Sequence, residues 1–315
     1  MDVSIIIVNW NTRDILKDCL NSIYRHTDGI GFEVIVVDNG SEDGSCGMVK
    51  DYFPNVVLIE NPQNRGFAAA NNQAMRIARG RNVLLLNSDT LVLDGAIVKT
   101  VAFADANPAA AVVGCRVLDR NGTVQQSCFM FPSITNLILA VTYLYKLFPR
   151  SRFFARERMG WWDGNDVRQV DAVAGCFMLV ARRAIEQTGM MDERFFMYGE
   201  ETDWCYRFKQ AGWKVMFTPD GEIIHLGAQS TRKSEAEMLI ELRMSILKFF
   251  EKHRGRFEHR TACILIVLFL AIRTCIWGIV AVLPLPKSKQ ARVKVRAYTT
   301  SILQIRRRPG IQARP

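Results

Sequence analysis

Residues 83–90 read Val-Leu-Leu-Leu-Asn-Ser-Asp-Thr. The apolar run predicts a strand that is buried on both faces, and the polar residues after it mark the end of that strand. Asp89 therefore follows a very apolar strand, where a carboxylate is costly to hold without a partner. One such partner is a divalent cation that bridges to a diphosphate. For Asp89 taken alone, this interpretation and a structural one are equally supported.

Strand patterns alternate with helical patterns on both sides of this stretch. This alternation predicts an α/β fold with a mainly parallel central sheet. Ligands on such sheets bind beyond the carboxyl ends of the strands, where Asp38, Asn64 and Asp89 are expected to converge. The predicted strands are Val3–Val8, Phe32–Val37, Val56–Ile59 and Val83–Leu86, and the predicted helices include Phe67–Ala78 and Gly95–Ala106.

The pattern changes after residue 111. Val112–Leu118 and Thr123–Gln126 flank Asn121-Gly122, which predicts a hairpin with a tight turn. Residues 129–166 mix aromatic, apolar and basic segments without a clear period. Regular structure is then predicted again, as strands at Val170–Val173, Cys176–Val180, Trp213–Phe217 and Glu222–His225.

An acidic stretch opens a predicted helix near residue 200, in the sequence Phe-Phe-Met-Tyr-Gly-Glu-Glu-Thr-Asp-Trp at 195–204. Acids in the first turn are favoured by the helix dipole, so a structural interpretation exists. The aromatic residues around them favour another, because apolar surroundings raise a carboxylate's pKa and suit it to proton transfer. Glu200, Glu201 and Asp203 are therefore candidate general bases.

His225 ends the apolar run Ile223-Ile224. A lone histidine there is more often a satisfied core residue than a ligand. Beside Asp89 the balance changes, because imidazole plus carboxylate suits Mn²⁺ or Mg²⁺. The sequence contains neither GxGxxG nor GxxxxGK[ST], which argues against a dinucleotide-binding dehydrogenase and a P-loop enzyme. Its eight cysteines occur singly and predict buried, reduced thiols rather than zinc ligands or disulfides.

The C-terminal region combines an apolar segment with a basic one. Residues 262–285 are long enough to span a bilayer, but Arg273 near the middle costs about 2.5–3.5 kcal/mol on insertion. Residues 287–315 carry nine Lys or Arg and no acid, out of a net charge of +10. If residues 262–285 spanned the bilayer, these charges would be carried across the membrane, against the tendency of basic segments to stay on the cytoplasmic side. A helix or bent helical pair lying on the membrane is therefore expected, with residues 262–315 on anionic lipid. A buried core helix is the alternative; nucleic acid is not expected as a partner.

Six motifs occur in the order found in family 2 glycosyltransferases, and the chain most resembles their bacterial rhamnosyltransferase-like branch over residues 2–250. The motifs are VSIIIVNWNT, VIVVDNGSEDGS, NRGFAAANNQAM, VLLLNSDT, GMMDERFFMYGEETDWCYRFKQAGWKV and IIHLGAQST. The resemblance implies a GT-A fold over 1–250, with a nucleotide-sugar-binding half at 1–118 and an acceptor-binding half at 119–250. An apolar membrane-associated helical segment at 251–286 and a basic tail at 287–315 follow.

The resemblance also assigns roles to residues. Asp89 and His225 match the metal ligands for Mn²⁺ or Mg²⁺, and Glu201 matches the catalytic base, a role that Glu200 or Asp203 could share. Asn87 replaces the first acid of the family's DxD motif, and Glu201 replaces an aspartate. There is no QxxRW motif, which argues against a processive synthase. The nucleotide-sugar-binding residues are Asn9, Asp38, Asn64, Gly66, Asn87 and Asp89.

The resemblance implies an inverting transfer of a sugar from a nucleoside diphosphate sugar to a lipid-linked or saccharide acceptor, in bacterial surface polysaccharide synthesis. Rhamnose is the sugar that the branch suggests. The expected location is the cytoplasmic face of the inner membrane, as a peripheral or monotopic protein. The alternatives are a catalytically inactive, membrane-bound nucleotide-sugar sensor or scaffold, and a nucleotidyltransferase.

Overall fold

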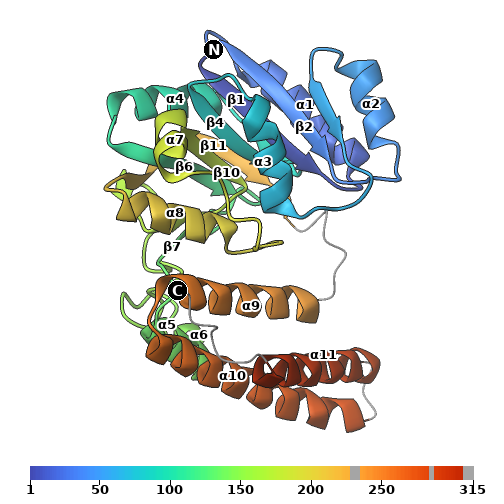
Figure 1. Ribbon diagram of the computed structural model, residues 1–315, viewed down its shortest axis with the longest axis vertical. Helices are drawn as coiled ribbons and strands as arrows, with labels where there is room; N and C mark the ends of the chain where they lie inside the picture. The colour runs from blue at the N-terminus through green and yellow to red at the C-terminus, as the bar shows by residue number, and fades with distance from the viewer. Residues whose placement is uncertain (228–234, 284–286, 308–315) are drawn as a thin grey trace, which may run out of the picture. The chain divides into compact units, whose positions relative to one another are not determined.

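The computed structural model of the protein describes residues 1–227, 235–283 and 287–307 (Figure 1). It divides into two compact units. Unit 1 comprises Met1–Phe131 and Arg158–Arg232, and unit 2 comprises Pro132–Glu157 and Lys233–Pro315. Residues 132–157 and 233–250, which the expected division gave to the glycosyltransferase domain, thus belong to the same unit as the C-terminal helices. Residues 228–231 of the IIHLGAQST motif, and Arg308 and Arg314, lie outside the described residues.

Unit 1 is built on one sheet with the strand order β3-β2-β1-β4-β10-β6-β11-β5, and β8 pairs with β11. β1 lies parallel between β2 and β4, whereas β10 runs antiparallel between β4 and β6. The expected α/β fold with its mainly parallel central sheet is confirmed. The bounds are β1 Val3–Asn9, β2 Phe32–Asp38, β3 Val57–Glu60, β4 Asn82–Asn87, β5 Thr90–Val92, β6 Ala110–Leu118, β8 Arg168–Gln169, β10 Phe177–Ala181 and β11 Lys214–His225.

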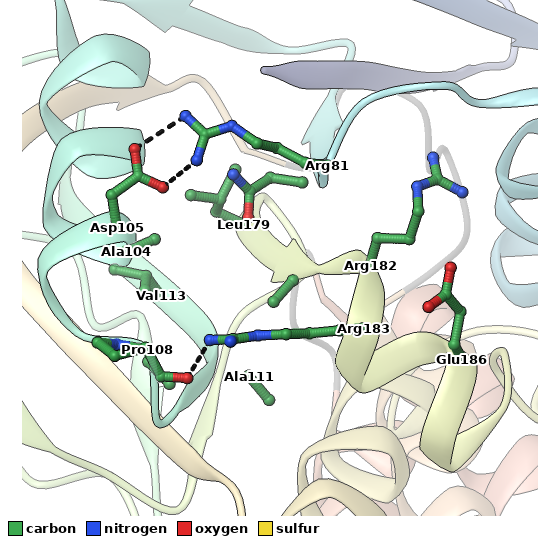
Figure 2. Close-up of a pocket in the computed structure, with 13 residues that line it drawn as sticks. Arg81, Ala104, Asp105, Pro108, Ala111, Val113, Leu179, Arg182, Arg183 and Glu186 are labelled. Carbon is green, nitrogen blue, oxygen red and sulfur yellow. Dashed lines mark hydrogen bonds and ion pairs between the residues drawn. The ribbon is translucent and has the colours of Figure 1, made fainter. Parts of the chain in front are cut away.

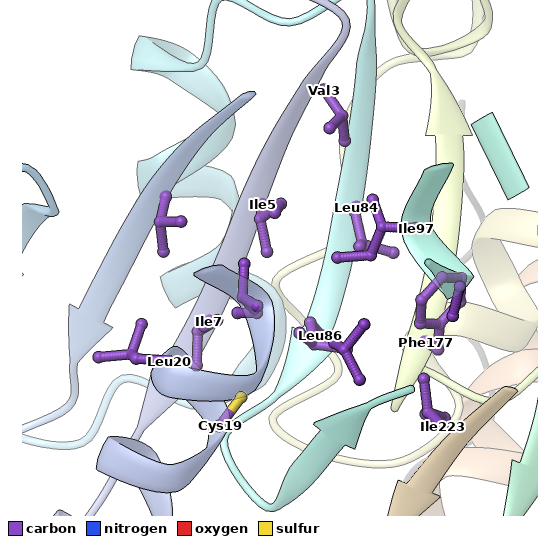
Figure 3. Close-up of a cluster of buried hydrophobic side chains, with 14 of the residues drawn as sticks. Val3, Ile5, Ile7, Cys19, Leu20, Leu84, Leu86, Ile97, Phe177 and Ile223 are labelled. Carbon is purple, nitrogen blue, oxygen red and sulfur yellow. The ribbon is translucent and has the colours of Figure 1, made fainter. Parts of the chain in front are cut away.

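Helices cover this sheet and bury its apolar strands. α3 packs on β1 and β2, and α4 packs on β6, β10 and β11. Ile5 and Ile7 of β1, Leu84 and Leu86 of β4, and Leu20 of α1 lie in one buried cluster (Figure 3). The helices of unit 1 are α1 Arg13–His26, α2 Ser45–Tyr52, α3 Phe67–Ile77, α4 Ala96–Ala106, α7 Arg182–Thr188 and α8 Glu200–Gln210.

The structure corrects several sequence expectations. The 121–122 turn forms, with Gly122 at φ +77°, but Thr123–Gln126 is no strand: only Val124 bridges, to Leu118. The strand expected at Val170–Val173 shortens to β9 Ala172–Val173, which pairs with β7 Cys128–Phe129. The strands expected at 213–217 and 222–225 are one strand, β11, with a register shift between Thr218 and Glu222.

Unit 2 contains helices and no strand among its described residues. Its core contains Phe250 of α9, Phe269 of α10 and Tyr298 of α11. The apolar segment expected at 262–285 is the helix α10, and much of the expected basic tail is a second helix, α11. Within the described ranges, α10 alone is long and apolar enough to cross a membrane. The helices are α5 Ile134–Val141, α6 Leu144–Leu147, α9 Glu235–His253, α10 Arg256–Val282 and α11 Ser288–Arg307.

Candidate functional site

The carboxyl ends of β1 and β2 bring two predicted nucleotide-binding residues into contact. Asn9 Nδ2 donates to Asp38 Oδ2 at 2.9 Å, and the backbone N–H of Ser41 donates to Asp38 Oδ1 at 2.8 Å. Asp38 is 2% exposed. Each of its carboxylate oxygens keeps a second lone pair, so Asp38 is held in place with acceptor capacity remaining.

Thr12 joins this corner to β4. It is the N-cap residue of α1, yet its hydroxyl makes no cap hydrogen bond. It donates instead to Asn9 Oδ1 at 2.6 Å and lies 3.1 Å from Ser88 Oγ. The Thr12 hydroxyl thus connects the end of β1 with the residues that follow β4.

The loop before α3 is closed by amide hydrogen bonds. Asn64 Oδ1 accepts from the Gly66 N–H at 2.9 Å and from Asn39 Nδ2 at 3.3 Å. The loop also reaches the segment before α8, because the Phe67 N–H donates to the Phe196 carbonyl at 2.8 Å. Asn64 and Gly66 therefore lie between the end of β2 and the acidic helix.

Asp89 and His225, 136 positions apart in the chain, meet at the end of β4. Thr90 pairs with His225 in the β5–β11 ladder, which brings His225 Nε2 to 3.3 Å from Asp89 Oδ1. Asn87 Nδ2 lies 3.3 Å from the same nitrogen. Asp89 is 4% exposed. A carboxylate, an imidazole and an amide therefore converge on one point at the sheet edge.

Gln125 fixes the orientation of the His225 ring. Its Oε1 lies 2.8 Å from His225 Nδ1. A carboxamide oxygen only accepts, so this contact assigns the proton to Nδ1 and leaves the Nε2 lone pair facing Asp89 and the Asn87 amide. Metal-binding histidines usually have such an acceptor behind the ring. Sequence analysis missed Gln125, because no local pattern links it to a residue 100 positions away.

The donor set suits a divalent cation. Two ligands that bind one cation at about 2.1 Å and at a right angle lie about 3 Å apart, close to the Asp89–His225 separation. No group of three His, Cys, Asp or Glu is found in the described part of the chain. The remaining coordination positions would fall to water or phosphate oxygens, as Mn²⁺ and Mg²⁺ accept.

Glu201 lies in the first turn of α8. Two residues with positive φ precede this helix in the sequence, Tyr198 with φ +66° and Gly199 with φ +91°. The Gly199 N–H donates to Glu201 Oε2 at 3.2 Å. Burial nevertheless raises the pKa of the Glu201 carboxyl above its ordinary value of 4.5. Backbone strain and a raised carboxyl pKa at one place are typical of functional sites.

The other two acids of this helix are more deeply buried. Asp203 is fully buried and its Oδ2 accepts from Arg207 Nε at 2.9 Å. Arg207 also donates to the Thr188 and Met190 carbonyls, so this ion pair holds α8 against the loop after α7. Glu200 is 3% exposed.

Cys176 directly precedes β10, beside the end of β4. Its carbonyl accepts from the Asn87 N–H at 3.1 Å. Burial raises the pKa of the Cys176 thiol to about 12, and the charges of Asp89 and Glu201 add to this rise. Both carboxylates therefore disfavour the thiolate form of Cys176.

A cavity of about 420 Å³ opens at the other edge, where β4 and β6 begin. Its arginines are engaged: Arg81 pairs with Asp105, and Arg183 donates to the Pro108 carbonyl (Figure 2). Arg182 donates to the Gly80 carbonyl. These contacts tie loops to the sheet. Asn9, Asp38, Asn87 and Asp89 of the predicted site lie at the opposite edge, where β1, β2 and β4 end.

The fold is of the GT-A type, which defines a class of glycosyltransferases. Residues 4–164 match the glycosyl transferase family 2. The chain belongs to this family, and the expected resemblance is confirmed.

Relatives of known description agree with this class. The chain is 29% identical over 234 residues to the N-acetylglucosaminyl-diphospho-decaprenol L-rhamnosyltransferase of Mycobacterium tuberculosis, covering 70% of this chain and 76% of the relative. It is 24% identical over 282 residues to the low-salt glycan biosynthesis hexosyltransferase Agl10 of Haloferax volcanii, covering 86% and 84%.

Solved structures share the fold. The mannosyltransferase PcManGT of Pyrobaculum calidifontis, in complex with GDP-Man and Mn²⁺, has a TM-score of 0.57 at 17% identity, covering 96% of this chain and 86% of that one. TarS residues 1–349 of S. aureus, in complex with UDP, has a TM-score of 0.52 at 17% identity, covering 97% and 91%.

Proposed function

We propose that this chain transfers a sugar, with inversion at the anomeric carbon, from a nucleoside diphosphate sugar to a hydroxyl of a lipid-linked saccharide. The main support is the approach of Asp89 Oδ1 to His225 Nε2, 3.3 Å apart, at the edge that also holds Asp38. On this proposal Asn9, Asp38, Asn64, Gly66 and Asn87 bind the nucleotide sugar, and Asp89 and His225 would hold Mn²⁺ or Mg²⁺. The cation would stabilise the negative charge on the leaving diphosphate.

Glu201 acts as the general base. The acceptor hydroxyl gives its proton to the Glu201 carboxylate as its oxygen bonds to the anomeric carbon. The bond from that carbon to the diphosphate oxygen breaks on the opposite face, and the diphosphate leaves with the electron pair. Asp203 holds Arg207 and keeps α8 in place, and Glu200 contacts the acceptor or supports the helix start.

The donor and acceptor classes follow from the relatives. We take deoxythymidine diphosphate rhamnose as the donor and a polyprenyl-diphosphate-linked saccharide as the acceptor, because the mycobacterial relative is a rhamnosyltransferase named for such an acceptor. The product would belong to a bacterial surface polysaccharide. To reach a lipid-linked acceptor, the enzyme must bind at the cytoplasmic face of the inner membrane. Unit 2 is proposed to make this contact, with anionic lipid.

A panel of nucleotide sugars, assayed with Mn²⁺ or Mg²⁺ and a polyprenyl-linked acceptor, tests this function. Release of nucleoside diphosphate that requires both donor and acceptor is expected, with the rhamnose donor turned over fastest. If nucleotide binds but no donor is turned over, the inactive sensor or scaffold becomes the better description. Pyrophosphate as the product would indicate a nucleotidyltransferase instead.

A further inference from the structure

α10 carries an apolar stripe that no described residue of unit 2 covers. The stripe contains side chains that are between 47% and 82% exposed: Phe257, Ile264, Leu268, Ile276, Ile279 and Val282. At 100° per residue they fall on one side of the helix, and the exposed Cys275 lies among them. The residues buried in the core, including Ala262 and Ile266, fall on the other side.

α11 packs along the second half of α10. Tyr298, 1% exposed, lies in the same core cluster as Phe269, and Lys294 Nζ is 4.1 Å from the centre of the Trp277 ring. The outward side of α11 is basic, with Lys289, Arg292 and Arg296 all exposed. Their spacing of three and four residues puts these three charges on one face.

Arg273 lies on the protein-facing side of α10. Its guanidinium donates to the Tyr143 hydroxyl at 2.9 Å and to the Tyr298 hydroxyl at 3.4 Å. The charge that interrupts the apolar sequence of α10 is therefore bound within unit 2. It leaves the exposed stripe uncharged.

These contacts decide between two placements of α10. If α10 crossed a bilayer, α11 would be carried with it, and Lys289, Arg292 and Arg296 would lie at hydrocarbon depth, which is costly. If α10 lies in the membrane plane, its stripe enters the boundary of the acyl chains by about 5–10 Å and these cations remain among the headgroups.

The charge also decides between lipid and a second copy of the chain. A symmetric pair formed through the stripe would place two basic C-terminal segments near one another, each with nine Lys or Arg and no acid over 287–315. Anionic headgroups would instead neutralise these charges.

We propose that α10 lies in the plane of an anionic membrane surface, with the stripe from Phe257 to Val282 immersed, and that it does not span the bilayer. This inference rests on the membrane contact in the proposed function and specifies its geometry. It does not depend on sugar transfer.

Flotation with vesicles tests the surface. The full chain is expected to float with vesicles of phosphatidylcholine and phosphatidylglycerol, and less with phosphatidylcholine alone. Ile264→Glu and Ile279→Glu should each lower binding roughly tenfold, because each puts a charge into the immersed stripe. The matched control is Ile77→Glu, which changes an equally apolar side chain, 48% exposed, on α3 of unit 1. It should bind like the parent protein.

Depth measurements test the orientation. A fluorophore is attached at Ile264→Cys, Leu268→Cys or Ile279→Cys, with Cys46, Cys263 and Cys275 replaced by Ser, and is quenched by lipids that carry nitroxides at shallow or deep positions. In-plane binding predicts the same shallow depth at all three sites. Depth that changes along the helix, by about 22 Å between 264 and 279, would mean spanning and overturn the proposal.

Two other results would also overturn it. No flotation would remove the membrane contact, and assays with a soluble acceptor analogue would then show whether sugar transfer survives without it. A concentration-dependent dimer in lipid-free buffer that is lost in Ile279→Glu would assign the stripe to a second copy.

Discussion

Gly66 packs directly against the carbonyl oxygen of Phe196. A Cβ on Gly66 would stand 2.5 Å from that oxygen and 2.8 Å from the Phe196 ring, and Gly66 has φ +83°. The nucleotide loop and the segment that leads into the acidic helix are thus in contact without a side chain between them. A change in the position of the loop before α3 must therefore also move the segment before α8.

Gly66→Ala should therefore damage both stability and nucleotide binding. With ψ 172°, Gly66 lies in a backbone region that is nearly restricted to glycine, so an alanine there costs about 1–3 kcal/mol. Displacing the Phe196 carbonyl adds about 1–3 kcal/mol. Gly29→Ala is the matched control, since Gly29 has φ +79° and nothing within 4 Å of the added Cβ. Denaturant unfolding and nucleotide titration measure both effects. Equal losses in the two variants would mean that the Phe196 contact is unimportant.

How far the sequence predicts the structure depends on whether the signal is local. The strands at 3–9, 32–38 and 82–87 are recognisable because runs of apolar residues are needed to bury both faces of a parallel sheet. β5 was missed because its three residues are too few to show a period. α11 was predicted only as a basic tail, although its apolar residues bury against α10.

The candidate site was predictable in part for the same reason. Asp38 and Asp89 follow recognisable strands, so their shared edge could be inferred from the sheet alone. The pairing of Asp89 with His225 was predicted from the chemistry of the two side chains and from the resemblance, and the β5–β11 ladder accounts for it. The contacts of Gln125 with His225 and of Gly66 with Phe196 depend on long-range packing, which no local pattern encodes.

Removing either proposed metal ligand should weaken cation binding. Asp89→Asn and His225→Ala are each expected to lower the affinity of the nucleotide-bound protein for Mn²⁺ by about tenfold or more, since each deletes one protein ligand. Electron paramagnetic resonance of free Mn²⁺ measures this directly. His26→Ala is the control, because His26 ends the 14-residue helix α1, about 20 Å from the helix start at the site. Unchanged Mn²⁺ affinity in both site variants would exclude this pair as the ligands.

Gln125 should act on the cation through His225. Gln125→Leu removes the acceptor for the Nδ1 proton and is expected to lower Mn²⁺ affinity about 10–100-fold. Gln125→Glu keeps an acceptor and should restore most of it. Nitrogen NMR of the labelled histidine should report the Nδ1–H tautomer in the parent and its loss in Gln125→Leu. The same tautomer in both proteins would refute the positioning role.

Glu201→Gln should abolish transfer and leave nucleotide binding nearly intact. The amide preserves size but cannot take the acceptor proton, so a loss of kcat of about 10²–10⁴-fold is expected. Asp203→Asn should differ by losing stability, because it breaks the buried pair with Arg207. Turnover like that of the parent in Glu201→Gln would remove Glu201 from the base role.

The acid side of the pH profile should identify the same carboxyl. Because burial raises its pKa, Glu201 is protonated, and inactive as a base, up to a pH above 4.5. The folded-state pKa exceeds the unfolded one, so the carboxyl favours folding at low pH and this contribution is lost as pH rises through the folded value. Glu201→Gln should therefore be more stable than the parent at neutral pH and equally stable in acid. An acid limb at or below 4.5 would contradict the assignment.

Thiol labelling should single out Cys275. Five of the eight free cysteines are buried, and burial raises the thiol pKa to about 12 at Cys19 and Cys128, which removes the reactive thiolate at neutral pH. Cys275 is exposed in the apolar stripe of α10, so it should react fastest with a maleimide in lipid-free buffer, and Cys275→Ser should lose that fast phase. Anionic vesicles should slow it, because an immersed stripe excludes both water and thiolate. A fast phase that vesicles leave unchanged would mean that the stripe faces water even when the protein is bound.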